Sequence, residues 1–541
     1  MSMATPQPRE EPEAPTAAPR VEPIVAELAK APERGGPGEV VLEVKDLKTY
    51  FFTYDGVVKA LDGVTLHIRR GETLGLVGET GCGKSVTAFS VTRLVSDPPG
   101  RVIGGKVRYR NANLLFGLEQ EAKFTPVPKS NRVKVKRAFR RIRSNMQRMS
   151  AVRGRAISMI FQEPTQAMNP VFSISNQLSE VLVLHRGPEI VDGLLKAKPD
   201  AAEARAAIEA LVEAGRQENR VEMREAANHL GEVVGSPSFG AQAFYIVRAA
   251  GAASEDAGKD VQRALRRLRL SNSQRRYLQH QRRLMLIDRA TNELYLEEMR
   301  RQAVNRIARI RLRGQRLRER SSHIYYRLWG VRNRVGKPLK DELFWRSVRL
   351  LEGVSIANPV QVARGFPHEL SGGMLQRVMI AEALSSEPDI LIADEPTTAL
   401  DVTIQAQILE LMRDLKTRVG TAILLITHDL AVIAEVADRV CVMYAGVIVE
   451  QGPVHDVFRR PLHPYAQGLL ASIPRLDQPD KQLSSIPGSV PDLIHPPSGC
   501  RFHPRCPYAM PVCKEARPPM TQEGPQHTVA CYLYKGPVAP E

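Results

Sequence analysis

The stretch "GETGCGKS", from Gly78 to Ser85, constrains the fold more than any other part of this chain. It follows the apolar run "TLGLV" and leads into "KSVTAFSVTRLV", which has a helical composition. A strand, a glycine-rich loop and a helix in this order turn backbone N–H groups towards an anion. The pattern G-x-x-x-x-G-K-[ST] is complete, with Gly78, Gly83, Lys84 and Ser85 at its fixed positions. The sequence therefore predicts a nucleoside triphosphate site in an α/β domain.

The phosphate-loop motif predicts a first set of residues that contact the nucleotide. Lys84 is expected to hold the β- and γ-phosphates, and Ser85 to ligate Mg²⁺. The residues predicted to line the phosphates are Gly78, Glu79, Thr80, Gly81, Cys82, Gly83, Lys84, Ser85 and Val86.

Two later apolar runs end in residues that can act on a bound triphosphate. "DILIAD" ends at Asp394, a predicted Mg²⁺ ligand, and Glu395 follows at once as the group that polarises the attacking water. "TAILLITHD" brings His428 to the end of another strand, where we expect it to contact the γ-phosphate. Gln162 in "MIFQEP" is predicted to sense both the γ-phosphate and the metal, as a third Mg²⁺ contact.

The apolar runs also indicate the architecture. "DILIAD", "TAILLITHD" and "RVCVMYAG" lack polar alternation, which is typical of strands buried on both faces of a parallel sheet. Residues from about 163 to 370 have a helical pattern. Within them the Arg-rich part predicts one or two long helices, with a helical hairpin as the arrangement of two.

A second glycine-rich stretch, "LSGGMLQR" from Leu370 to Arg377, lacks the Lys-Ser ending of a phosphate loop. With it, the chain resembles the ATP-binding subunits of ABC transporters, and "LSGGMLQR" is similar to their signature motif. The resemblance implies a RecA-like core with a helical subdomain, and a head-to-tail dimer in which the signature touches ATP on the opposite subunit. "TALD" resembles the D-loop, which lies at the interface of that dimer. The contacts implied are Ser371, Gly372, Gly373, Gln376 and Asp401, with an aromatic in "KTYFFTY" stacking on adenine: Phe51 by position, or Tyr50 or Phe52.

The end of the chain narrows the resemblance. "RRPLHPYAQGLLASIPRLD" and "GCRFHPRCP" resemble the tail of oligopeptide/dipeptide importer ATPases. This implies ATP-driven peptide import at the cytoplasmic face of the cell membrane. The implied partners are two transmembrane permeases, a second ATP-binding subunit, identical or related, and an extracytoplasmic solute-binding protein. Nickel, oligosaccharides or antimicrobial peptides stay open as cargo. A non-transport ABC ATPase acting on nucleic acid is the rival class, which the single cassette and the importer-like tail disfavour.

The resemblance divides the chain into three parts. Residues 1–38, rich in Pro, Ala and Glu, are predicted to be a disordered tail. Residues 39–455 form the ATP-binding domain, with basic insertions at about 105–150 and 187–345 in or beside its helical subdomain. Residues 456–541 form the importer-type C-terminal region.

Four of the six cysteines lie in the last 42 residues, in the pattern C-x5-C-x6-C-x17-C. In a cytosolic protein such clustering favours a metal over disulfides. A [4Fe–4S] cluster, zinc and free thiols all stay open, and the resemblance favours the cluster, in a structural role. The four are Cys500, Cys506, Cys513 and Cys531, whereas Cys82 and Cys441 are interpreted as ordinary small residues.

The net charge of +17 is concentrated in the insertions. Residues 129–155 hold 11 Lys or Arg and no acid, and residues 261–320 hold 18 Arg and five acids. The basic segments are interpreted as a solvated helical arm, a contact with anionic lipid or permease loops, or a nucleic-acid contact. The last is disfavoured because the sequence shows no nucleic-acid module. No run of 18 apolar residues predicts a membrane span.

Overall fold

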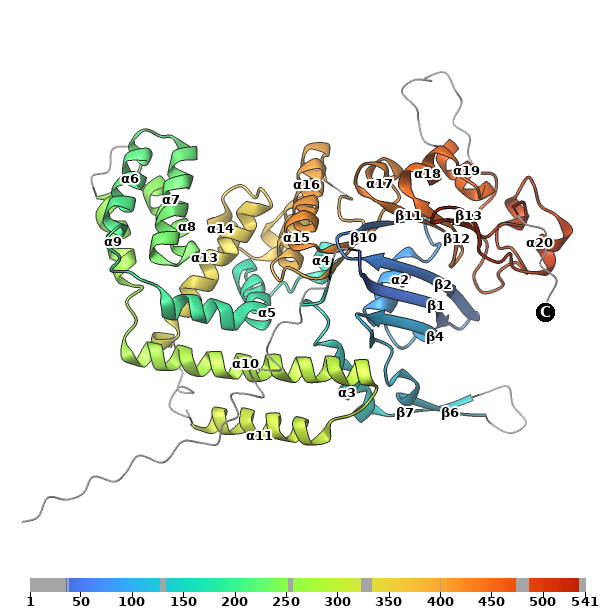
Figure 1. Ribbon diagram of the computed structural model, residues 1–541, viewed down its shortest axis with the longest axis horizontal. Coiled ribbons are helices and arrows are strands. Elements are labelled where there is room, and N and C mark those ends of the chain that lie inside the picture. The colour runs from blue at the N-terminus through green and yellow to red at the C-terminus, as the bar shows by residue number, and fades with distance from the viewer. Residues whose placement is uncertain are drawn as a thin grey trace, which may run out of the picture.

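The computed structural model describes residues 36, 38–126, 133–251, 256–322, 333–398, 400–472 and 486–534 (Figure 1). The N-terminal tail predicted for residues 1–38 lies almost wholly outside the described residues.

An eight-stranded sheet forms the centre of the molecule. Its strands are, in spatial order, β13 (Thr521–Gly524), β14 (His527–Val529), β12 (Val447–Pro453), β11 (Arg439–Tyr444), β3 (Thr73–Val77), β10 (Ala422–Ile426), β9 (Ile390–Asp394) and β8 (Ile157–Ile160). The five strands from β11 to β8 are parallel, as the apolar runs predict. β12 instead returns antiparallel to β11, because only a short turn joins the two strands.

The strands β3, β9, β10 and β11 are buried at every residue. Alternate side chains enter two separate apolar clusters, since successive residues of a strand point to opposite faces. Leu391 and Ala393 of β9 lie in one cluster, and Ile390 and Ile392 lie in the other. A run of apolar residues without alternation is therefore what this position in the sheet requires.

A second, antiparallel sheet covers one face of the phosphate-loop helix α2 (Lys84–Val91). α2 contacts strands of both sheets, and its Ala88 and Val91 share an apolar cluster with them. The strands of this sheet are, in order, β2 (Val57–Arg69), β1 (Val40–Phe52), β4 (Gly100–Tyr109) and β5 (Ala112–Asn113).

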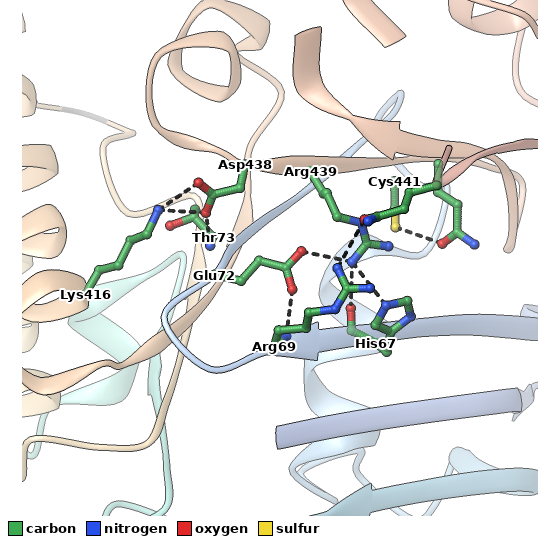
Figure 2. A network of polar contacts seen from close by, with 10 residues as sticks. His67, Arg69, Glu72, Thr73, Lys416, Asp438, Arg439 and Cys441 are labelled. Carbon is green, nitrogen blue, oxygen red and sulfur yellow. Dashed lines mark hydrogen bonds and ion pairs between the residues drawn. The ribbon is translucent and has the colours of Figure 1, made fainter. Parts of the chain in front are cut away.

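A partly buried polar network fixes the amino ends of β3 and β11 beside each other (Figure 2). The Thr73 N–H donates to the Asp438 carboxylate at 2.7 Å, and Lys416 also binds that carboxylate. Arg439 pairs with Glu72 at 2.9 Å, and both side chains are buried. A buried pair of this kind is costly to break, because either partner alone would be an uncompensated charge. The network therefore fixes where β3 begins, and hence where its phosphate loop emerges.

Helices follow the sheet on the side of β8, as the helical pattern of residues 163–370 predicts. The helices within that range are α4 (Pro164–Ala167), α5 (Ile174–Lys196), α13 (Lys337–Gly353), α14 (Pro359–Arg364) and η3 (Pro367–Glu369). α15 (Gly372–Leu384) follows them and packs against β8, α4 and α13. α16 (Val402–Val419) comes between β9 and β10 in the chain.

The insertions form structures of their own. A small helical cluster holds α6 (Ala204–Arg216), α7 (Arg220–Val234), α8 (Pro237–Ala250) and α9 (Ala257–Arg266). The predicted hairpin of long helices is confirmed as α10 (Asn272–Arg301) and α11 (Arg306–Ser322), which lie side by side (Figure 1). α10 begins with a capping box, in which the Ser271 side chain accepts from Gln274 N. The earlier insertion holds η1 (Leu118–Gln120), β6 (Ala122–Pro126), β7 (Val133–Arg137) and α3 (Phe139–Met149).

The C-terminal region wraps back onto the edge of the main sheet, to which it adds β13 and β14. Its helices and the preceding one are α17 (Leu430–Val436), α18 (Val454–Arg459), α19 (Pro464–Ala471), η4 (His503–Arg505) and α20 (Pro511–Glu515). In the part of the chain described here, no helix combines the length and apolar character needed to cross a bilayer.

Candidate nucleotide-binding and hydrolysis site

The phosphate loop joins β3 to α2 and depends on two glycines with positive φ. Gly78 has a φ of 155°, and a Cβ there would lie 2.1 Å from the carbonyl oxygen of Met443. Gly83 has a φ of 107°, and a Cβ there would lie 2.7 Å from the carbonyl oxygen of Ala60. Both positions therefore exclude a side chain, since the surrounding backbone cannot yield.

The cation and hydroxyl of this loop are already positioned. The Lys84 ammonium donates to the carbonyl oxygens of Gly78 and Glu79 at 2.7 and 3.1 Å, so its charge lies across the loop. The Ser85 hydroxyl donates to Asp394 Oδ1 at 3.1 Å. β3 supplies the loop and β9 supplies Asp394, so the parallel sheet brings the two motifs together.

Asp394 is a buried carboxyl at the end of β9. Burial, together with the neighbouring Glu395, raises its pKa to about 6, although the Ser85 hydrogen bond and Lys84 act in the opposite direction. A carboxylate and a hydroxyl side by side are hard oxygen donors of the kind Mg²⁺ takes. The donor set of Ser85 and Asp394 therefore fits the predicted metal, whose charge would offset the cost of ionising Asp394.

The Glu395 carboxylate is held by three side chains from separate segments. Gln162 Nε2 donates to Oε2 at 3.0 Å, and the Thr398 hydroxyl donates to the same atom at 3.2 Å. His428 Nδ1 lies 3.2 Å from Oε1. Glu395 also has a φ of 49°, a strained value for a residue with a side chain. Gln162, Glu395 and His428, predicted separately from the sequence, thus meet at one point, and Thr398 joins them.

The signature segment opens α15. The Ser371 side chain caps this helix by accepting from Met374 N, and both Ser371 and Gly372 are exposed. A Cβ on Gly372 would meet no atom within 4 Å, so an anion from another chain can approach the helix end. Gln376 is placed differently, because it is buried and donates to the carbonyl oxygen of Pro396 at 2.9 Å. Gln376 therefore links α15 to the loop after Glu395, and its nucleotide contact stays a prediction.

The structure also places the two other predicted nucleotide contacts, Asp401 and the adenine-stacking aromatic. Asp401 is exposed and caps α16 by accepting from Ile404 N at 2.9 Å, while Ala399 of the same motif lies outside the described residues. Among the aromatic candidates, the Tyr50 hydroxyl binds Asp62, and Phe52 is exposed. Phe51 is half-buried with its ring against Gly100, and its role in adenine stacking stays a prediction.

The C-terminal region reaches the phosphate loop directly. The Arg505 guanidinium makes a two-pronged ion pair with the Glu79 carboxylate, at 2.7 and 3.1 Å. The Tyr465 hydroxyl accepts from the Glu79 N–H at 2.8 Å. A second tie joins Arg501 to Asp62 at 2.7 Å. The sequence does not predict these contacts, because no spacing rule shows that residues 426 positions apart, Glu79 and Arg505, will meet.

The four tail cysteines surround a common cavity. Cys500, Cys506, Cys513 and Cys531 all line it. Burial raises the pKa of Cys500 to about 11, and the neighbouring thiols act in the same direction. Across the described residues, however, no three or more His, Cys, Asp or Glu side chains are arranged as a metal-ligand group. The thiols thus share a location that fits one metal group, without the geometry of a formed site.

The fold and the site define the class of protein. A phosphate loop, a buried acidic strand end and a clamped glutamate at one edge of a parallel sheet are the parts of a P-loop ATPase. Residues 61–285 and 322–398 match the ABC transporter family, and residues 449–513 match the oligopeptide/dipeptide transporter C-terminal region. The chain belongs to the ATP-binding proteins of the ABC transporter family.

Curated relatives match this chain over nearly their whole length. The oligopeptide transport ATP-binding protein AppD of Bacillus subtilis is 33% identical over 495 residues, which cover 92% of this chain and 97% of the relative. The oligopeptide transport ATP-binding protein OppD of Escherichia coli is 31% identical over 508 residues, covering 94% and 97%. Among solved structures, a dimeric bacterial ABC transporter cassette is 16% identical and covers 76% of this chain and 98% of its own, with a TM-score of 0.37.

The clamp between the tail and the phosphate loop predicts a non-additive mutational effect. Arg505→Met leaves the Glu79 carboxylate unpaired beside the phosphates, so ATP should bind about tenfold more weakly, a change of about 1.4 kcal/mol. Adding Glu79→Gln removes the uncompensated charge and should restore most of the affinity. Titration of a fluorescent ATP analogue measures this, with Arg413→Met, which breaks the exposed pair with Glu410, as the control. Additive losses in the double variant would contradict the electrostatic role.

Proposed function

We propose that this chain is an ATP-hydrolysing subunit that energises the import of oligopeptides or dipeptides. The observation that carries the proposal is the clamped Glu395, set beside the Ser85–Asp394 pair in a chain whose C-terminal region is of the oligopeptide/dipeptide transporter type. The proposed cargo rests on the curated relatives, which are named as oligopeptide and dipeptide transport ATP-binding proteins.

The chemistry assigns a separate role to each group. Lys84 and the loop N–H groups neutralise the β- and γ-phosphates. Ser85, Asp394 and Gln162 would hold Mg²⁺, which supplies further charge neutralisation when bound. Glu395 polarises the attacking water, and the hydrogen bonds that fix its carboxylate keep that base aimed at one place. His428, whose side chain is 62% exposed, can reach the γ-phosphate from the end of β10.

The signature segment implies a site shared between two chains. Each chain carries one phosphate loop and one exposed α15 N-terminus, and we propose that they meet head to tail across ATP. The Gln376–Pro396 link then connects the signature helix to the loop that follows Glu395. Through this link the helical subdomain follows the state of the nucleotide.

Two transmembrane permeases, a second ATP-binding subunit and an extracytoplasmic solute-binding protein would complete the importer, with this chain at the cytoplasmic face of the cell membrane. The ATP-binding domain would span residues 39–455, with its insertions, and the C-terminal region residues 456–541. The hydrogen bond from Gln376 of α15 to the loop after Glu395 supports placing the permease contacts on the helical subdomain.

Replacing the catalytic carboxylate tests the hydrolytic role. Glu395→Gln keeps the size and hydrogen-bonding reach of the side chain but removes the base. Phosphate release should fall by about 100-fold or more, while ATP affinity stays within about twofold. Glu410→Gln, an exposed position on α16, is the matched control. If phosphate release by Glu395→Gln equalled that of the parent protein, the assignment of the base would be wrong.

The tail cysteines are proposed to hold a [4Fe–4S] cluster as a structural staple. The support is the single cavity that all four line. Anaerobic purification should yield about four irons and four sulfides per chain, and Cys513→Ser should lose them together with part of the thermal stability. Cys441→Ser, on buried β11, is the control that should keep the iron. Zinc in place of iron, or a metal-free protein with unchanged stability, would refute this proposal without touching the ATPase assignment.

A further inference from the structure

Helix α11 presents an apolar stripe to solvent. Ile307, Ile310 and Leu317 are 66%, 71% and 61% exposed, although they lie in a regular helix. Their spacing of three and seven residues places them on one face. Gly314 lies on the same face, and a Cβ there would meet no atom within 4 Å. Three large aliphatic side chains in a row on one helix face are more than scattered surface residues.

Exposed arginines border the stripe on both sides. At 100° per residue, one row runs along one border and a second row along the other. Neither row has a salt bridge within 4.0 Å to any residue that the structure describes. The first row is Arg306, Arg313 and Arg320, and the second is Arg311 and Arg318.

The opposite face of α11 is fixed to α10. Leu312 packs with Ala290 and Leu294 of α10 in a small apolar cluster. Arg309 pairs with the buried Glu298, and Arg316 pairs with Asp288 at 3.0 Å. Packing and ion pairs thus hold α11 in one orientation, so that the stripe faces outward.

The turn end of the hairpin is anchored in the ATPase core. Leu296 and Met299 of α10 belong to the apolar cluster under the main sheet. Figure 1 shows the hairpin running along one margin of the molecule, with α11 on its outer side. The match to the ABC transporter family leaves out residues 286–321, which include almost all of α11. The stripe therefore belongs to an addition to the cassette and not to the nucleotide site.

We propose that α11 docks on the surface of an anionic lipid bilayer, a contact that goes beyond the proposed ATPase and transport function. The stripe would enter the boundary between headgroups and acyl chains, and the two arginine rows would meet lipid phosphates on either side. Charge complementarity selects this occupant. A second copy of α11 would set arginines against arginines, and a nucleic acid would leave the three aliphatic side chains in water.

Vesicle co-sedimentation with the full chain tests the docking. Wild-type protein should bind vesicles of phosphatidylglycerol and phosphatidylcholine at least tenfold more strongly than pure phosphatidylcholine, and salt should weaken the binding. The triple change Ile307→Gln, Ile310→Gln and Leu317→Gln should weaken binding to the anionic vesicles at least tenfold. Arg311→Gln with Arg318→Gln should weaken binding to the anionic vesicles only.

A matched control carries Val221→Gln and Leu184→Gln, which replace exposed apolar residues on α7 and α5 and should bind as wild type. ATP hydrolysis in detergent-free solution should be equal in all variants, which shows that each is folded and separates this test from the proposed function. Equal binding to both vesicle types, or no effect of the triple change, would overturn the proposal. So would stripe-dependent self-association in sedimentation velocity, or RNA binding that needs the arginines while vesicles fail to compete.

Discussion

Parallel pairing of β3, β10, β9 and β8 is the constraint on which the site depends. The register sets Leu76 beside Ile426, and Ile426 beside Asp394, so the carboxyl ends of the strands finish level with one another. Groups that follow those ends converge because each leaves the sheet at the same edge. A shift of one residue in any strand would exchange its two faces and move its functional group away from the edge.

Electrostatics then determines how the site is prepared before nucleotide arrives. The sheet buries Asp394, which raises the pKa of that carboxyl, and the same edge collects the cation of Lys84. The backbone of Glu395 is strained, and three side-chain contacts fix the position of its carboxylate. Such preorganisation fixes the base before substrate binds, so less reorganisation is needed during reaction. The tail adds its own charge through Arg505, and so makes the importer-type C-terminal region part of the phosphate loop's support.

The sequence predicts those parts of the structure in which residue order reflects spatial order. The phosphate loop, the acidic end of β9 and the helical hairpin of α10 and α11 are each contiguous, and local periodicity or spacing reveals them. The contact between Arg505 and Glu79 depends on how distant segments fold back, which no local pattern encodes. The arginine excess was visible in the sequence, but only the packing of α11 against α10 shows which of its faces stays exposed.

We propose that one chain's phosphate loop and another chain's signature helix complete a single ATP site. Ser371→Arg tests it most directly, measured as ATP turnover in the presence of the natural partner subunit carrying the equivalent change. The bulky cation should block the exposed end of α15 and lower turnover about 100-fold, while nucleotide binding to the phosphate loop persists. Ser371→Ala, which removes the same helix cap without adding bulk, should cost much less. Unchanged turnover in the arginine variant would contradict the shared site.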